Sequence, residues 1–395
     1  MEKQLEVAHI FRAHGQSFRE SFKHGMQTRH YRVMNAIEIC RTAELGGHVD
    51  ECDTCNEVRI SYNSCRNRHC PKCQGLDKEK WVEARKHELL PTNYFHVVFT
   101  LPDTIRPVAL RNQKCVYNML FKACSETLKE LALDPQYLGV RIGFIALLHT
   151  WTRQLLDHPH LHCIVSGGGL SLDGSQWISC RKKFFIPVKV LSRLFRGKFL
   201  FYLKKAWNAG ELVFPGKIEH LRERKTFQAF LNDLYQPEWV VYCKPPFHNT
   251  ETVMDYLGRY SHRVAISNDR LVKMDAGRVS FRYRDSRDKD RMKVTSLDAH
   301  EFIRRFLLHV LPDNFMKIRH YGFLCNRNKK ATLQSVRELL GFDKNDESPD
   351  QANESWEELL FRLTGVNPRL CPACGKGIMR RKGILPKGNN RSPPP

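Results

Sequence analysis

The sequence predicts an α+β fold preceded by a small helical, cysteine-rich domain. Segments with strand patterns and segments with helix patterns are mixed along the chain without strict βαβ alternation, which favours the α+β class. Five of the 14 cysteines crowd into residues 52–73, ahead of most predicted strands. The chain has 395 residues, 42% hydrophobic and 27% charged, so it can bury a sizeable core. We expect an N-terminal helical and cysteine-rich domain (1–90), a main domain (91–330) and a basic C-terminal region (331–395).

The N-terminal domain is predicted to begin with helices up to about residue 45. Phe11, Phe18 and Phe22 are spaced seven and four residues apart, which suits one apolar helix face. The cysteine-rich segment His48–Gln74 follows. A polar helix is then expected over Asp77–Glu88.

The main domain is predicted from alternating strand and helix signals. β-Branched and aromatic runs bounded by Gly or Pro indicate strands, and longer 3.6-residue patterns indicate helices. Gly167–Gly169 and Pro245–Pro246 are expected to end the strands before them. Strands are predicted at 94–100, 140–149, 160–166, 183–188, 239–244 and on both sides of a turn near Asp275, and helices at 108–133, 191–208, 252–260 and 297–311.

The charge of the chain points to a polyanionic partner. Lys and Arg number 64 against 42 Asp and Glu, a formal net charge of +22. Such an excess repels itself unless a polyanion neutralises it, and nucleic acid is the usual one; a merely basic protein is the alternative. No apolar run reaches the ~20 residues of a membrane helix, and the first residues lack a signal-peptide pattern. We therefore expect a cytoplasmic, DNA-associated protein without a membrane partner.

The cysteines of residues 52–73 are spaced as metal ligands. Clustered Cys-x-x-Cys pairs in a chain without a secretory signal indicate metal binding rather than disulfides. Two such pairs complete a tetrahedral zinc shell, and four protein ligands make the zinc structural. The most economical set is Cys52, Cys55, Cys70 and Cys73. Three other residues remain substitutes or members of a second site, namely Cys65, His69 and His48.

A further Cys-x-x-Cys pair lies near the C-terminus. Cys371 and Cys374 have no obvious second pair in the sequence. They are candidates for an additional zinc site, as half a ribbon completed by Cys325 or a histidine, or as a knuckle docked elsewhere.

Two histidines form a candidate clamp for a second kind of metal. His160 and His162 are two residues apart in a strand pattern, so they share one face with Ile164. Two imidazoles on a rigid strand can hold a metal ion if a neighbouring element supplies a third ligand. Structural or exposed histidines are the alternative interpretation.

Tyr256 and Tyr260 are candidate nucleophiles. Their i, i+4 spacing places both hydroxyls on one face of a predicted helix. The same residues, with Val253 and Leu257, also fit a plain core stripe. A tyrosine becomes a usable nucleophile towards phosphorus if a metal withdraws charge from the phosphate and cations stabilise the phenolate. Arg259, His262 and Arg263 are close in sequence and suit the latter role.

Seven segments resemble rolling-circle insertion-sequence transposases of the IS91 family. The resemblance runs in order over residues 9 to 330. It rests on the segments Tyr62–Gln74, Tyr94–Pro102, Leu148–Trp151, His158–His162, Trp239–Phe247, Tyr256–Asn268 and Ile318–Gly322.

The resemblance implies a fold, a chemistry and a set of roles. The fold would be that of the HUH endonucleases, an antiparallel sheet with flanking helices, and residues 91–330 would be the catalytic domain. His160 and His162 would hold Mg²⁺ or Mn²⁺, although ligand softness alone favours zinc or iron. Tyr256 and Tyr260 would cut single-stranded DNA at the ends of the element and at targets, through 5′-phosphotyrosine links and without a nucleotide cofactor. The third metal ligand stays open among His149, Gln154, His158 and His262.

Basic residues suggest where DNA would bind. Arg59, Arg66, Arg68 and Lys72 surround the zinc motif, and residues 278–293 hold seven Lys and Arg. In the second stretch Arg282 and Arg284 alternate with Phe281 and Tyr283, a pattern that suits phosphate contact with base stacking. Arg259 and Arg263 complete this candidate set, and a solvated hairpin is the alternative for 278–293. A replication initiator or relaxase, and a non-catalytic zinc DNA-binding protein, remain alternative functions.

Overall fold

The structure is a computed structural model that describes residues 4–86, 88–180, 185–247, 252–253, 258, 265–285, 288–327, 329–342 and 355–388. It divides into two compact units that are interleaved in the sequence. The first unit comprises Met1–Trp81, His262–Val310 and Glu347–Pro395, and the second comprises Val82–Ser261 and Leu311–Asp346. The sequence predicted three consecutive domains instead. Composition does not indicate that residues 262–310 and 347–395 belong to the same unit as residues 1–81.

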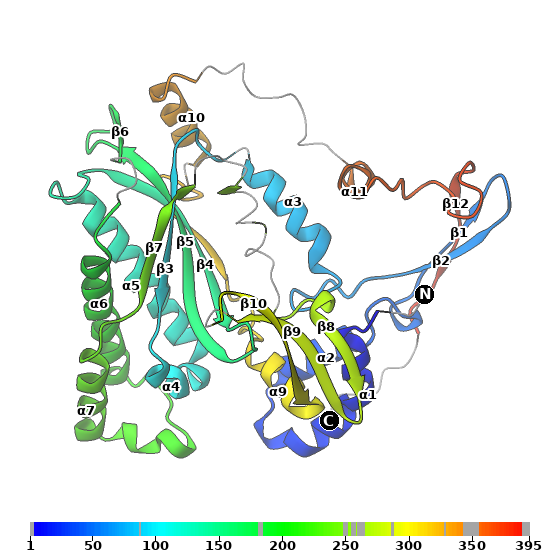
Figure 1. Ribbon diagram of the computed structural model, residues 1–395, viewed down its shortest axis with the longest axis horizontal. Helices are drawn as coiled ribbons and strands as arrows, with labels where there is room; N and C mark the ends of the chain where they lie inside the picture. The colour runs from blue at the N-terminus through cyan, green and yellow to red at the C-terminus, as the bar shows by residue number, and fades with distance from the viewer. Residues whose placement is uncertain are drawn as a thin grey trace. The chain divides into compact units, whose positions relative to one another are not determined.

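The second unit is built on an antiparallel sheet with the strand order β11-β4-β5-β3-β7, and β6 pairs with β5 (Figure 1). This confirms the α+β class and the antiparallel sheet. The elements of this unit are β3 (Tyr94–Thr100), α4 (Arg106–Arg111), α5 (Gln113–Leu133), β4 (Arg141–Trp151), β5 (Asp157–Leu170), β6 (Trp177–Ser179), α6 (Val188–Asn208), α7 (Arg224–Tyr235), β7 (Val241–Phe247), β11 (Ile318–Gly322) and α10 (Lys329–Leu339). Helix α3 (Gln74–Lys86) joins it to the first unit.

The core of the second unit lies on one face of this sheet. Alternate residues of the central strands point into it, such as Val97 of β3, Phe144 of β4 and Leu161 of β5, each fully or almost fully buried. Helices α5 and α6 cover this face with their own apolar residues (Figure 1). The opposite face carries the other half of each strand's side chains, including the histidines.

Two predicted strand ends are wrong, each for a reason in the sheet. Strand β5 continues through Gly167–Gly169 and pairs closely with its neighbour there. A Cβ at Gly169 would lie 2.5 Å from the Arg141 carbonyl oxygen of the neighbouring strand. Glycine is thus needed inside the strand rather than after it. Strand β7 continues through Pro245 and Pro246 because it is an edge strand, where a missing backbone N–H is tolerated.

Other boundaries differ by a few residues. The strand expected at 183–188 is not formed by its described residues: Phe185 and Ile186 are buried in the core, and Val188 begins α6. The helix expected at 252–260 lies largely outside the described residues.

The described residues of the first unit form two three-stranded sheets and a group of helices. Its elements are α1 (Val7–Phe22), α2 (Thr28–Glu38), β1 (Gly47–Cys52), β2 (Val58–Tyr62), β8 (Leu271–Asp275), β9 (Arg278–Asp285), β10 (Arg291–Asp298), α9 (Ala299–Leu308), α11 (Trp356–Thr364) and β12 (Met379–Leu385). The strand orders are β10-β9-β8 and β12-β1-β2.

Aromatic contacts hold the helices of the first unit together. Phe11 of α1 meets Phe306 of α9 edge-to-face, with ring centroids 5.3 Å apart, and both are buried. Phe18 is buried too, which confirms the apolar face predicted for this helix, while Phe22 at its end is partly exposed. Asp298 caps α9 by accepting hydrogen bonds from the N–H groups of His300 and Glu301, so the helix begins at Ala299. Among the described residues no helix has the length and apolarity that a bilayer crossing requires.

Candidate metal centres and nucleic-acid interface

Three histidines converge on the face of the second unit's sheet that lies opposite its core. His149 of β4 lies directly opposite His160 of β5, and His162 follows on the same face of β5. One nitrogen from each of the three rings lies within 4.8 Å of the others. His149 and His162 are buried. The structure therefore brings the predicted pair together with His149, one of the four candidates for a third ligand.

Two of the other three candidates have contacts of their own. His158 Nδ1 lies 3.6 Å from a carboxylate oxygen of Asp103 and outside the cluster. Gln154 lies in the turn between β4 and β5, where its N–H donates to Thr152 Oγ1. His262 lies outside the described residues.

Hydrogen bonds orient two of the three imidazoles. His160 Nδ1 lies 2.6 Å from the carbonyl oxygen of His158, so it carries the proton and donates it. This leaves the Nε2 lone pair of His160 for another partner. His162 Nδ1 lies 2.9 Å from Nε2 of His96, a buried histidine of β3. Such bonds to the far nitrogen are typical of metal-ligating histidines.

Burial keeps His160 and His96 neutral at neutral pH. It lowers the pKa of His160 to about 4, although the hydrogen bond to His158 opposes the shift. Burial, with the nearby charge of Lys244, lowers the pKa of His96 to about 3. A neutral imidazole is the form that binds a metal ion. The chemistry of the donor set, three imidazole nitrogens on two rigid strands, therefore fits one divalent cation with coordination positions left for a substrate.

The candidate nucleophiles belong to the helix expected at 252–260. Tyr256 and Tyr260, with Arg259 and Arg263, lie outside the described residues.

The cysteines form two clusters, neither of which is the predicted set. The first cysteine cluster contains Cys40, Cys65, Cys70 and Cys73, and the second contains Cys52, Cys55, Cys371 and Cys374. The predicted grouping of Cys52 and Cys55 with Cys70 and Cys73 is wrong. Strands β1 and β2 form a hairpin, with Cys52 and Cys55 at its turn and Cys65 beyond its open end. At about 3.4 Å per residue, five strand residues separate the two sites by about 17 Å.

The first cysteine cluster has the dimensions of a zinc site. Its Sγ atoms lie 3.6 Å apart for Cys40 and Cys73, 3.5 Å for Cys65 and Cys73, and 3.7 Å for Cys40 and Cys70. Four sulfurs bound to one tetrahedral zinc at about 2.3 Å stand about 3.8 Å apart. Cys65 thus joins the set as a member and not a substitute. Cys40, at the end of α2, was missed because it stands alone in the sequence.

The two histidines considered as zinc ligands lie outside both clusters. His69 is not among the grouped ligands, and its backbone N–H donates to Asn67 Oδ1. His48 Nε2 lies 3.3 Å from Asp50 in strand β1.

Comparison with known proteins identifies the family. Residues 143–331 match the family described as "Putative transposase", and residues 10–101 match the "Transposase zinc-binding domain" of the IS91 type. The chain is 53% identical to "Putative transposase y4qJ" of Sinorhizobium fredii, over 95% of this chain and 94% of that protein. It is 27% identical to the transposase for insertion sequence element IS801 of Pseudomonas savastanoi pv. phaseolicola, over 91% and 85% of the two chains. The chain belongs to the IS91 family of transposases.

The two matched regions coincide with the two kinds of metal centre. The zinc-binding match covers the whole first cysteine cluster of this transposase, and the other match covers the three histidines. The cysteine clusters suit structural zinc, as the sequence predicted. Cys371 and Cys374 lie beyond both matched regions.

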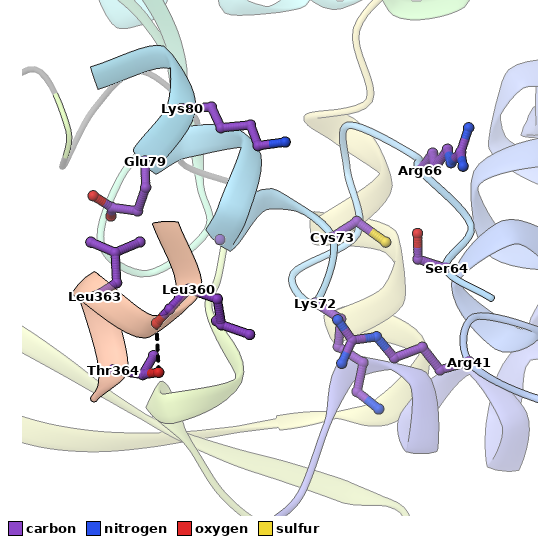
Figure 2. A pocket seen from close by; sticks show the side chains of 11 residues that line it. Arg41, Ser64, Arg66, Lys72, Cys73, Glu79, Lys80, Leu360, Leu363 and Thr364 are labelled. Carbon is purple, nitrogen blue, oxygen red and sulfur yellow. Dashed lines mark hydrogen bonds between the residues drawn. The ribbon is translucent and has the colours of Figure 1, made fainter. Parts of the chain in front are cut away.

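A basic cleft lies beside the first cysteine cluster of the transposase (Figure 2). Its volume is about 890 Å³, and Arg41, Arg66, Lys72 and Lys80 line it together with Cys73. Leu360 and Leu363 of α11 line the other side. Four cations and one carboxylate, that of Glu79, make the cleft a candidate phosphate-contact surface.

Two of the predicted basic residues, one of them in the cleft, already pair with carboxylates of the first unit. Arg59 is 3.4 Å from Asp50, and Lys72 is 2.7 Å from Glu6, so both take part in ion pairs within the unit. Arg282 and Arg284 lie on the exposed face of β9, opposite Val294 and Met292 of β10. Phe281, expected to stack on bases, is instead fully buried against Phe302. Phe281 therefore cannot stack on bases, whereas Tyr283 is half-buried and stays a candidate together with the arginines of β9.

Proposed function

We propose that this transposase nicks and joins single-stranded DNA through 5′-phosphotyrosine links, in rolling-circle transposition of its insertion sequence. The observation that carries the proposal is the three-histidine cluster on a rigid sheet. Family membership already implies an enzyme that cuts and joins DNA. A cluster of imidazoles that can hold a divalent cation is what a metal-assisted phosphoryl transfer needs.

The histidines would position the scissile phosphate. One ring nitrogen each of His149, His160 and His162 would hold Mg²⁺ or Mn²⁺, which would withdraw charge from the phosphate and so favour nucleophilic attack. The carbonyl group of His158 and the ring of His96 keep His160 and His162 in the ligating orientation. Because these partners are buried or on β-strands, the site needs little rearrangement when DNA binds.

The tyrosines would carry out the covalent step. The hydroxyl oxygen of Tyr256 or Tyr260 attacks phosphorus, the bond between phosphorus and the 3′ oxygen breaks, and the 3′ oxygen leaves as a hydroxyl with the tyrosine's proton. The DNA end is then held as a 5′-phosphotyrosine. Attack by another strand's 3′-hydroxyl reverses these steps, joins the strands and restores the phenol. Two tyrosines allow a second cut before the first end is released.

The test is a search for the covalent adduct. Full-length protein is incubated with single-stranded DNA from the ends of its element, with Mn²⁺ or with EDTA, and analysed under denaturing conditions. We expect a metal-dependent adduct that mass spectrometry maps to Tyr256 or Tyr260. Tyr256→Phe combined with Tyr260→Phe should abolish it while DNA binding persists, and Tyr235→Phe, on the exposed side of α7, is the matched control. DNA binding without any adduct would instead indicate a non-catalytic zinc protein.

A further inference from the structure

The second cysteine cluster joins parts of the chain that are more than 300 residues apart. Cys52 and Cys55 come from the β1–β2 turn, and Cys371 and Cys374 from the segment before β12. Their Sγ atoms lie 3.8 Å apart for Cys52 and Cys374, and 3.7 Å for Cys55 and Cys371. These distances match the spacing of about 3.8 Å in a tetrahedral zinc–sulfur site, and they are far longer than the 2.0 Å of a disulfide.

Both Cys-x-x-Cys turns have the backbone geometry of a metal knuckle. The N–H of Thr54 donates to Cys52 Sγ at 3.4 Å, and the N–H of Gly377 donates to Cys374 Sγ at 3.3 Å. Such N–H···S bonds stabilise thiolates, the form in which cysteine binds metal. A Cβ at Gly377 would lie 2.4 Å from Cys52 Sγ, so only glycine permits the two turns to approach this closely.

Strand pairing and polar contacts continue from the cluster. Strand β12 pairs with β1 from Cys52 opposite Met379 to Gly47 opposite Leu385. Asp53 accepts hydrogen bonds from the N–H of Ile378 at 2.8 Å and from Arg380 Nε at 3.1 Å. The pairing makes β1 the central strand of its three-stranded sheet. Strand β12 is therefore part of the same sheet as the β1–β2 hairpin.

Apolar burial at this junction is small. In the part of the chain that the structure describes, the buried apolar cluster here consists of Cys52, Cys371 and Met379, with Cys374 packed against it. Several apolar side chains of the same sheet are exposed, among them Val58, Ile60 and Ile384. A module with so little core usually requires a metal ion to fold.

We propose that the second cysteine cluster binds its own structural zinc ion, and that this zinc folds residues 355–388 onto the β1–β2 hairpin. The transposase would then hold two structural zinc ions, one in each cysteine cluster. The C-terminal segment would be an integral part of the zinc-binding domain, although the family match to that domain ends at residue 101. This inference is independent of the cleavage chemistry proposed above.

Zinc stoichiometry tests the proposal. Full-length protein carrying His160→Ala, so that the three-histidine cluster contributes no zinc, should contain two zinc ions per chain. Cys371→Ser combined with Cys374→Ser should lower the content to one. Cys325→Ser is the matched control, because Cys325 is exposed and lies in neither cluster, and it should leave the content at two. A double variant that still binds two zinc ions would overturn the proposal.

A second measurement on unmodified protein covers the case in which the double variant fails to fold. Cysteines are alkylated with and without a zinc chelator and identified by mass spectrometry. We expect Cys52, Cys55, Cys371 and Cys374 to be protected together and to become reactive together when the chelator is present, while Cys325 reacts in both conditions. Rapid alkylation of Cys371 and Cys374 in zinc-loaded protein would contradict the proposal. Neither measurement uses DNA, so its outcome is separate from that of the adduct assay.

Discussion

The three-histidine cluster and the second cysteine cluster show two ways of assembling metal ligands. The histidines lie on β4 and β5, whose other face is packed on an extensive core that includes Phe144, Leu148 and Leu161. The cysteines lie on turns beside a buried cluster of three residues. On the proposals above, the sheet would position its ligands without a metal, whereas the cysteine modules would depend on one. This difference predicts that metal removal abolishes the chemistry of the three-histidine cluster but leaves its sheet folded. At the second cysteine cluster, metal removal should abolish folding.

The largest effect is expected from breaking the first cysteine cluster. Cys70→Ser removes a buried ligand, and structural zinc contributes on the order of 10 kcal/mol to the folding of small domains. We expect the variant to lose one zinc ion per chain and residues 63–73 to lose hydrogen-exchange protection, with β4 and β5 unchanged. Cys325→Ser should change neither quantity. Loss of protection in β4 and β5 as well would show that the sheet is not independent of zinc.

The reverse experiment disturbs the sheet and leaves the zinc in place. Phe144 is fully buried and stacks on Tyr321 with ring centroids 4.9 Å apart. Phe144→Ala should cost about 3–5 kcal/mol of unfolding free energy in the second unit. Urea denaturation monitored by hydrogen exchange would measure the change in unfolding free energy. The zinc content should stay at the wild-type value. A lower zinc content would mean that the two units fold together.

Removing a histidine ligand should affect activity and not folding. His160→Ala is expected to reduce the rate of adduct formation more than ~100-fold, since second-sphere changes alone cost up to that much. The melting temperature should change little, because His160 is only half-buried and belongs to no apolar core cluster. The zinc bound by the cysteines should also be unchanged. An active His160→Ala protein would remove the three-histidine cluster from the proposed mechanism.

His96 offers a smaller and more specific test. It contacts His162 through a hydrogen bond and is not itself one of the three clustered ligands. His96→Phe keeps the ring volume but removes the bond, so the affinity for Mn²⁺ should fall by about 10–100-fold. The maximal rate at saturating Mn²⁺ should fall much less. His96→Gln, which can restore a hydrogen bond, should recover part of the affinity, and equal losses in both variants would argue for a purely packing role.

Much of the histidine site could be predicted from the sequence, because it depends on local geometry. Strand alternation alone places His160 and His162 on one face. The selection of His149 required the register of β4 against β5, which is set by the turn at 152–156 and a bulge near His149, and no residue pattern specifies these. Cys-x-x-Cys spacing likewise identified the pairs Cys52–Cys55 and Cys371–Cys374. It did not indicate that the two pairs lie in one cluster. The wrong grouping followed from ignoring the length of the β1–β2 hairpin, which separates cysteines that are close in sequence.

The smallest effect is a pH dependence of the sheet's stability in metal-free protein. His96 and His160 have folded-state pKa values of about 3 and about 4, below the usual 6.5 of an unfolded chain. Below pH 6.5 the unfolded state binds protons that the folded state does not, so stability falls as the pH decreases from 6.5 towards 4. Each histidine contributes at most about 1.4 kcal/mol per pH unit. Urea titrations at pH 7.5 and pH 5, followed through the hydrogen-exchange protection of β4 and β5, would measure the loss of unfolding free energy. His96→Phe should make the dependence of this free energy on pH shallower. An unchanged slope would show that His96 is not held neutral by the fold.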